Sequence, residues 1–292
     1  MTMGMVISKF KTYLSLTKPG IIRGNLMLAT AGFLLASKSQ IDWGNLATVL
    51  VSIMLIIASA CVFNNFIDRE IDKKMARTQK RALVNGLVSG RNALIYASIL
   101  GLAGLIILAK YTNGLTFLAG TIGFVDYVVI YGLAKRRSTL STLIGSISGA
   151  MPLVAGYLAV TNHFNAVVIV LFLIMVFWQM AHFFAIAIYR YDDYKAAGLP
   201  VLPVKKTIKS AKQQIISYIV AYDLSILYLG YSAKMSKIYF IVAGLMGLWW
   251  LVLGIKLWPN KDDQTWGKRM FLVSLVEITL FSILLSVDAF FK

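Results

Sequence analysis

The sequence predicts an all-α fold, a polytopic membrane bundle of about nine transmembrane helices with its N-terminus on the inner side. Two observations predict this class. Of the 292 residues, 59% are hydrophobic and only 14% are charged, whereas a soluble globular domain is about 45–50% apolar and about 25% charged. The apolar residues also gather in blocks of roughly 18 to 22 residues, each long enough to cross a hydrocarbon core as an α-helix. Continuous blocks fit helices rather than the alternating strands of a membrane barrel.

The spans follow one another with short connections. The first follows the basic start MVISKFKTYLSLTKPG, the second contains the apolar run VSIMLIIASACVF, and the second and sixth each run out into a basic loop that bears Asp residues. The longest loops have about 20 residues, which is too short for a soluble domain, so we expect one intramembrane domain over residues 1–292. In order, the predicted spans are 20–37, 46–67, 91–109, 115–133, 140–160, 166–189, 213–231, 238–255 and 270–288.

Lys and Arg residues are unevenly divided between alternate loops. With the N-terminus inside, the five inside segments hold four, seven, three, six and four of them, and the outside segments hold the other five of the 29. Cytoplasmic loops of membrane proteins carry such an excess, so we expect the N-terminus inside and the C-terminus outside. Because this distribution accounts for most of the formal net charge of +17, we expect no nucleic-acid partner.

A polar stripe stands at the inner end of the second span. Asn64, Asp68 and Asp72, the oxygen stripe, are spaced four residues apart, and on a helix this spacing keeps them on one face with a rise of about 6 Å per step. Oxygen ligands suit a hard cation such as Mg²⁺, which usually keeps several waters and also binds substrate phosphates. The stripe therefore predicts a magnesium–diphosphate site where the helix leaves the membrane.

Basic residues follow the oxygen stripe directly. Acidic residues can bind a metal ion while neighbouring basic residues bind the remaining negative charge of a diphosphate, so the two groups together suit a metal–diphosphate complex. On spacing alone an alternative stays open, in which the acids of DREIDKK form a helix end at the interface and pair with their own lysines. The basic residues are Lys73, Lys74, Arg77, Lys80 and Arg81.

The segment NNFIDREIDKKMARTQKRALVNG, residues 64–86, resembles the first aspartate-rich motif, N-x-x-x-D-x-x-x-D, of the UbiA-type intramembrane prenyltransferases. Three further segments are similar to the protohaem IX farnesyltransferases of that superfamily, and the resemblance covers nearly the whole chain. Quinone-precursor prenyltransferases typically carry a second D-x-x-x-D motif in place of W-Q-x-x-H-F and D-Y-x-x-A-G. The three segments are LTKPGIIRGN (16–25), KRRSTLSTLIGSISGAMPLVAGYLAVT (135–161) and WQMAHFFAIAIYRYDDYKAAGLPVLPV (178–204).

The resemblance implies that a farnesyl group passes from farnesyl diphosphate to a vinyl carbon of haem b, giving haem O and diphosphate. It also implies Mg²⁺ as the cofactor, the lipid bilayer of the bacterial inner membrane as the location, and a haem A synthase or terminal oxidase assembly as a candidate partner. In such a reaction a site closed to water protects the allylic cation from hydrolysis, and a hydrophobic bundle provides one.

Carried over residue by residue, the resemblance implies catalytic metal ligands at Asn64, Asp68, Asp72 and Asp193. For the pair Lys135 and Arg136, a charge that only sets topology is the alternative to diphosphate contact. The implied substrate contacts are Arg77, Arg81, Lys135, Arg136, His182, Tyr189, Arg190 and Tyr194.

His182 is one of only two histidines and lies on an apolar predicted helix, where it shares a stripe with Arg190. Three interpretations stay open: contact with haem, ligation of the haem iron, and a hydrogen-bonded core histidine. Asp126 and Asp223 stand mid-span where an apolar residue is expected. A buried carboxylate is costly unless it is paired or protonated, so we expect both to face the bundle interior as structural groups.

Two other functions remain open at this point. An aromatic or quinone-precursor prenyltransferase would use the same diphosphate chemistry on a different acceptor. An ion or solute transporter would use Asp126 and Asp223 as relay groups. Against the transporter, the clustered acids stand at the inner end of the second span, whereas transporter sites tend to lie near the midplane.

Overall fold

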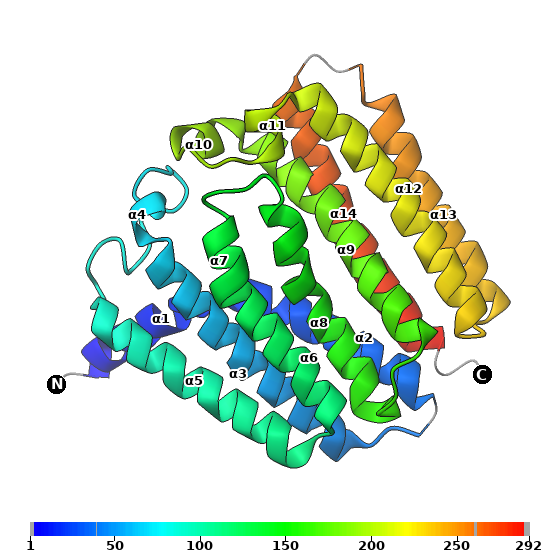
Figure 1. The fold of residues 1–292 in the computed structure, drawn as a ribbon, viewed down its shortest axis with the longest axis horizontal. Coiled ribbons are helices and arrows are strands. Elements are labelled where there is room, and N and C mark those ends of the chain that lie inside the picture. Colours follow the sequence, from blue (N-terminus) through cyan, green and yellow to red (C-terminus); the bar gives the residue numbers. More distant parts are fainter. Residues whose placement is uncertain (1–2, 39, 260–261, 289–292) are drawn as a thin grey trace.

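The computed structural model describes residues 3–38, 40–259 and 262–288, and every regular element within these ranges is a helix (Figure 1). Within them, nine helical segments are long and apolar enough to cross a membrane, and each overlaps one predicted span. The chain is therefore a multi-pass membrane protein with an all-α fold. The segments are α2 (Pro19–Ser37), α3 (Trp43–Ile67), α5 (Gly90–Tyr111), the joined α6–η1–α7 (Gly114–Ala134), α8 (Ser141–Thr161), α9 (Ala166–Tyr189), α12 (Ile208–Ser232), α13 (Lys237–Lys256) and α14 (Asp263–Asp288).

Helix starts are set by capping side chains as well as by the lipid boundary. Thr207 accepts a hydrogen bond from the Ser210 backbone N–H, so α12 begins at Ile208 rather than at residue 213. Helix α14 begins at Asp263 rather than at residue 270, because the Asp262 side chain accepts a hydrogen bond from the Thr265 backbone N–H at 3.1 Å. Asp263 also pairs with Lys212 of α12 at 2.7 Å. Polar turns of this kind extend a helix beyond its apolar stretch because the first N–H groups find side-chain acceptors.

The fourth span is not a uniform α-helix. It consists of α6 (Gly114–Val125), the π-helix η1 (Asp126–Ile130) and α7 (Tyr131–Ala134). The Asp126 side chain is buried and accepts a hydrogen bond from the Ser148 backbone N–H of α8 at 3.0 Å. Asp126 therefore faces the bundle interior, as expected, and ties η1 to α8.

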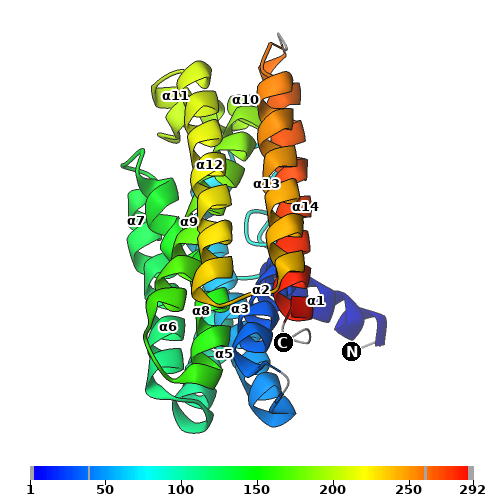
Figure 2. The same ribbon diagram turned by 90° about the vertical axis from the view of Figure 1, so that its right-hand side faces the viewer.

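Helix α9 lies in the middle of the bundle, between α8 on one side and α12 and α14 on the other (Figures 1 and 2). Helices α2 and α8 approach so closely that two glycines are required. A Cβ on Gly32 would stand 2.1 Å from the Leu153 carbonyl oxygen, and one on Gly156 would stand 2.0 Å from that of Ala29. Small residues that let backbones meet are typical of helix packing in lipid.

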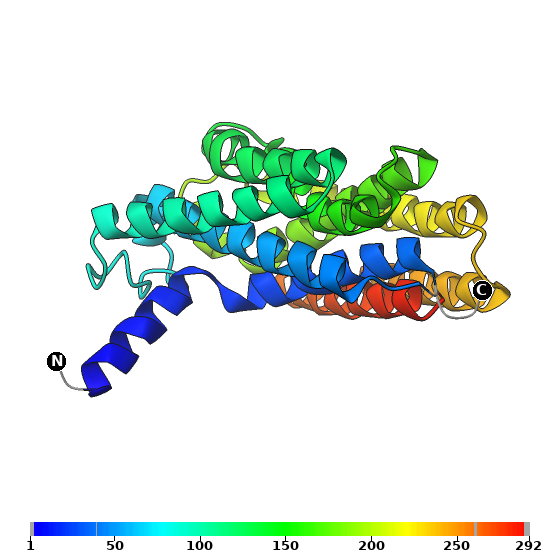
Figure 3. The ribbon, with the colours of Figure 1, turned by 90° about the horizontal axis from the view of Figure 1, so that it is seen from below.

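Short helices gather at the end of the bundle that the charge distribution assigns to the inner side. They are α4 (Arg69–Asp72), α10 (Tyr191–Ala196) and α11 (Leu202–Lys205) (Figure 1). Helix α1 (Met3–Leu16), which the span pattern does not predict, projects away from the bundle (Figure 3). The connections after the second, fourth and sixth spans thus meet at one end, beside the oxygen stripe.

Candidate active site

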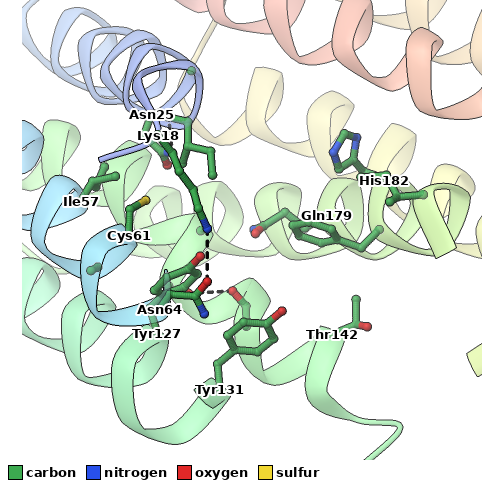
Figure 4. A pocket seen from close by; sticks show the side chains of 18 of the residues that line it. Lys18, Asn25, Ile57, Cys61, Asn64, Tyr127, Tyr131, Thr142, Gln179 and His182 are labelled. Carbon is green, nitrogen blue, oxygen red and sulfur yellow. Dashed lines mark hydrogen bonds between the residues drawn. The ribbon is translucent and has the colours of Figure 1, made fainter. Parts of the chain in front are cut away.

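A cavity of about 710 Å³ lies inside the bundle, and its walls come from α2, α3, α6, α8, α9 and α14. It reaches the end where α4, α7 and α10 meet, since Asp72, Lys135 and Tyr194 all line it. Figure 4 shows Lys18 and Asn64 on one side of this cavity and His182 across from them, with Gln179 between. A polar mouth thus leads into a largely apolar chamber.

All three members of the oxygen stripe line the cavity and are almost completely buried. Helix α3 ends at Ile67, so the stripe crosses a junction with α4 instead of lying on one continuous helix. The spacing survives because the Asp68 N–H bonds to the Asn64 carbonyl at 2.9 Å and the Asp72 N–H to the Asp68 carbonyl at 2.8 Å. The three side chains therefore stay on one face, as predicted.

Each side chain of the stripe accepts a hydrogen bond from a cation outside the DREIDKK segment. The acids do not pair with their own lysines, since only the exposed Glu70 bonds to Lys73. Buried acids held by cations from other parts of the chain favour the site interpretation over a simple helix end. The pairs are Lys18–Asn64 (Nζ to Oδ1, 3.2 Å), Lys135–Asp68 (Nζ to Oδ2, 2.6 Å) and Arg81–Asp72 (Nη1 to Oδ2, 2.5 Å).

Lys18 is a site residue whose contact the sequence did not predict. It caps α2 in a left-handed backbone conformation, φ 53°, directly before Pro19. Non-glycine residues in this region cost free energy and cluster at functional sites. Burial, together with the nearby cations Arg81 and Lys135, lowers the pKa of Lys18 to about 8. Its membership of the TKPG segment was the only available signal.

Lys135 stands just beyond the end of α7. Burial acts to lower its pKa, but the neighbouring Tyr131 phenol and Asp68 carboxylate outweigh burial and raise the pKa above its usual value. Lys135 is therefore a fixed positive charge at the cavity mouth, held 2.6 Å from Asp68. A lysine that only set the membrane topology would not need this contact with Asp68, which lies 67 positions away in the sequence.

The structure brings most of the implied substrate contacts together at the cavity, but it does not bring all of them. Arg136 does not line it and instead donates a hydrogen bond to the Ile67 carbonyl at the end of α3. Asp193, which the resemblance implied as a metal ligand, is half-buried on α10 and also lies outside the cavity lining. Those that line it are Arg77, Arg81, Lys135, His182, Tyr189, Arg190 and Tyr194.

The residues of the stripe fit a divalent cation that is shared with a substrate. The Asp68 Oδ1 atom is buried and has no hydrogen-bond partner among the described residues. Within the same residues no three His, Cys, Asp or Glu side chains cluster to hold a metal by themselves. Two carboxylates and one amide oxygen therefore suit Mg²⁺, which commonly binds one or two carboxylates and takes its other ligands from water and phosphate.

The opposite wall of the cavity is formed by α9 and α14. The Trp178 indole N–H donates to the Ser274 carbonyl at 2.8 Å, and the Gln179 amide donates to the Ser146 and Met175 carbonyls, each at 3.0 Å. These bonds fix two polar side chains of the W-Q-x-x-H-F segment in an apolar wall. Sequence reasoning did not single out Gln179.

A second pair of acids lies away from the cavity. Glu277 of α14 is fully buried, and neither of its carboxyl oxygens has a partner in the described part of the chain. Asp223 of α12 is half-buried against Gly247 of α13, and neither acid lines the cavity. Asp223 is thus less enclosed than the bundle-interior position that was expected for it.

Comparison with known proteins identifies the family. The model of the UbiA prenyltransferase family matches residues 25–276. The chain belongs to the UbiA prenyltransferase family. This UbiA chain is 48% identical to the protoheme IX farnesyltransferase of Enterobacter sp. (strain 638) over 280 residues, which are 96% of this chain and 95% of that protein. It is 47% identical to the enzyme of the same name from Photorhabdus laumondii over 95% of each chain.

Solved structures of low sequence identity share the UbiA fold. A digeranylgeranylglyceryl phosphate synthase structure matches with a TM-score of 0.81 at 19% identity, over 98% of this chain and 100% of that one. A UbiA homologue from Archaeoglobus fulgidus bound to GPP and Mg²⁺ matches with a TM-score of 0.72 at 16% identity, over 94% and 99% of the two chains.

Proposed function

We propose that this UbiA prenyltransferase transfers the farnesyl group of farnesyl diphosphate to a vinyl carbon of haem b. The allylic C–O bond to diphosphate breaks, and the vinyl group attacks the resulting allylic cation to form a C–C bond. Water then adds to the new cation beside the pyrrole and releases one proton, which gives haem O and diphosphate. The proposal is supported by the names of the relatives, which state this activity, and by the residues that line the cavity.

One observation carries the proposal: a buried oxygen stripe beside three cations stands at the mouth of an apolar cavity. We propose that Asn64, Asp68 and Asp72 hold Mg²⁺ there together with the diphosphate. Bound in this way, Mg²⁺ supplies positive charge to the leaving group as its negative charge grows. The A. fulgidus homologue, which was solved with GPP and Mg²⁺, supports this choice of ion.

The cations of the mouth are the chain's own groups for the diphosphate. Lys18, Arg81 and Lys135 already lie within hydrogen-bond distance of the stripe, so phosphate oxygens that enter beside the stripe come within their reach. Charge-assisted hydrogen bonds of this kind are about twice as strong as neutral ones. We propose that Arg77, which is exposed at the cavity edge, adds a further contact.

The other substrate contacts that the resemblance implied concern the acceptor, haem b. We propose that His182, Tyr189, Arg190 and Tyr194 contact haem b, since all four line the cavity. The Arg190 guanidinium stacks 4.2 Å over the Tyr189 ring and offers a cation for a haem propionate. Asp193 and Arg136 lie outside the lining, so a metal-ligand role for Asp193 and a substrate contact for Arg136 require α10 and the α7–α8 connection to move toward the mouth.

The apolar part of the cavity suits both a cation and a long isoprenoid. Ile53, Ile56 and Ile57 of α3 line it, and Tyr127 and Tyr131 stack with ring centroids 5.6 Å apart on the same side. Aliphatic walls exclude water from the allylic cation, and aromatic faces attract positive charge.

The experiment that tests the proposal compares separated acceptors. Membranes that contain the chain receive farnesyl diphosphate and Mg²⁺ with either haem b or a hydroxybenzoate, and products are resolved by reversed-phase chromatography. We expect a later-eluting haem and no prenylated benzoate. Product with the benzoate alone contradicts the haem acceptor, and solute flux without diphosphate release contradicts a transferase.

The relatives and the charge distribution also bear on the membrane in which the chain lies and on its orientation there. We propose the bacterial inner membrane, because the relatives are bacterial and the Lys and Arg distribution predicts the diphosphate mouth on the inner side. Labelling of an Arg77→Cys variant tests this orientation, since the native Cys61 is buried. We expect labelling from the inner side only, and labelling from outside reverses the topology.

A further inference from the structure

The His182 ring is held in one orientation by its neighbours. It is buried on α9, and it stacks on Trp178 with a centroid distance of 4.6 Å and an interplanar angle of 20°. Phe183 and Phe271 lie against it at centroid distances of 5.3 and 5.2 Å. An imidazole packed by three aromatic rings has little freedom to turn, so the direction of each ring nitrogen is fixed.

One residue of α14, Ser274, determines which nitrogen carries the proton. His182 Nδ1 lies 2.7 Å from Ser274 Oγ, and the Ser274 hydroxyl donates to the Phe271 carbonyl at 2.7 Å. A hydroxyl has a single hydrogen, so Ser274 Oγ can only accept from the histidine. Nδ1 therefore carries the hydrogen, and in the neutral ring Nε2 keeps its lone pair. The same serine also accepts the Trp178 indole N–H through its carbonyl, and so it fixes both rings.

The free nitrogen faces the cavity. His182 lines the cavity, and Nε2 makes no hydrogen bond to any described residue. A core histidine kept only for packing would have both nitrogens satisfied or enclosed, and Nε2 is absent from the enclosed polar atoms without a partner. The arrangement matches the one by which proteins prepare metal-binding histidines, with one ring N–H donated to a fixed acceptor and the other nitrogen open.

Together these contacts suit a bound molecule whose metal ion has a free coordination position for Nε2. We propose that Nε2 of His182 binds the iron of the haem acceptor and that Ser274, as a positioning residue, sets the tautomer that makes this possible. The inference rests on the proposed function, because haem is the acceptor. A single neutral imidazole in an apolar pocket holds the iron reversibly, which suits a haem that must leave as product, and it fixes the macrocycle relative to the diphosphate mouth.

The test is the absorption spectrum of ferric haem b titrated into the purified full-length chain without farnesyl diphosphate. We expect the spectrum of histidine-ligated haem for the unmodified chain, and we expect His182→Ala to lose it. His163→Ala is the matched control, since His163 is the only other histidine in the sequence and lies exposed between α8 and α9. It should leave the spectrum unchanged.

Two further variants separate ligation from folding. In His182→Gly, added imidazole should restore the histidine-type spectrum, because a folded pocket accepts the missing ring. Ser274→Ala should weaken haem binding by about tenfold, the lower end of the effect of removing a group that orients a metal-binding histidine, and Ser274→Thr should recover it. Equal haem affinity in Ser274→Ala and the unmodified chain overturns the positioning role.

The result for iron ligation is distinguishable from the result for the transferase activity. If His182→Ala keeps the unmodified spectrum, or if the spectrum is of the thiolate type that Cys61 would give, iron ligation by His182 is wrong even when haem O forms. If the histidine-type spectrum depends on His182 but no haem O forms with farnesyl diphosphate and Mg²⁺, the haem site stands and the proposed reaction fails.

Discussion

Two pairs of acids in the helix bundle differ in whether a cation lies beside them. Asp68 and Asp72 line the cavity mouth, and each is paired with a cation at 2.6 Å or less. Asp223 and Glu277 lie among α12, α13 and α14, outside the cavity, and three of their oxygens have no partner in the described part of the chain. Asp68 and Asp72 stand just beyond the inner end of α3, whereas Asp223 and Glu277 stand within the membrane helices α12 and α14. A buried acid is therefore not by itself evidence of a binding site, whereas a cation partner and access to a cavity are.

The largest expected effect comes from the mouth pair. If Asp68 holds the Mg²⁺ and diphosphate as proposed, Asp68→Asn should lower haem O formation by at least about 100-fold, because it removes a negative charge from that site. The measurement is haem O produced per unit of membrane-inserted protein, by chromatography. The substitution also leaves Lys135 without its partner, and an unpaired buried charge destabilises a fold.

A double variant, Asp68→Asn with Lys135→Met, distinguishes catalysis from folding. It should regain thermal stability relative to Asp68→Asn because no unpaired lysine remains, yet it should stay inactive. Recovery of haem O formation in the double variant contradicts a catalytic role for Asp68.

Removal of divalent cations should have an effect of similar size on the unmodified chain. We expect EDTA to abolish haem O formation and Mg²⁺ to restore it, since the stripe supplies only oxygen ligands. An unchanged rate of haem O formation in EDTA would contradict metal binding by Asp68 and Asp72.

A smaller effect is expected from the cations of the mouth. Lys135→Ala should raise the KM for farnesyl diphosphate by about tenfold, since one charge-assisted hydrogen bond to phosphate contributes about 1.5–3 kcal/mol. The KM for haem b should not change. Steady-state kinetics with each substrate varied in turn measures both, and an equal rise in the two KM values places Lys135 outside the diphosphate site.

The smallest effect on activity is expected from the second pair of acids. Glu277→Met should leave haem O formation unchanged and should raise the thermal unfolding midpoint, because an apolar side chain of similar size replaces a buried carboxyl group without partners. Thermal denaturation in detergent, followed by aggregation, measures the shift. Loss of activity in a well-folded Glu277→Met variant would show that Glu277, although it lies outside the cavity, is needed for the reaction.

The sequence predicted the spans well because lipid leaves few alternatives to an apolar helix of fixed length. It also predicted that Asn64, Asp68 and Asp72 share one face, since four-residue spacing survives a mild break in the helix. The starts of α12 and α14 were not predicted correctly, because polar capping turns begin these helices in a region that hydropathy does not mark.

The contacts across the cavity were not accessible to sequence reasoning. The bond from Lys18 to Asn64 depends on how α2 and α3 meet, and the tautomer of His182 depends on Ser274, 92 residues away. No local pattern encodes such contacts. For the same reason the D-Y segment indicated Asp193 as a ligand although α10 holds it outside the cavity lining.

Equilibrium binding of farnesyl diphosphate to the purified chain, without haem, shows whether the oxygen stripe and a divalent cation together hold the diphosphate. We expect tight binding with Mg²⁺, weak binding in EDTA, and weak binding in Asp68→Asn under both conditions, while Glu277→Met should behave like the unmodified chain. Binding that is equally tight in EDTA and in Asp68→Asn would contradict this joint role.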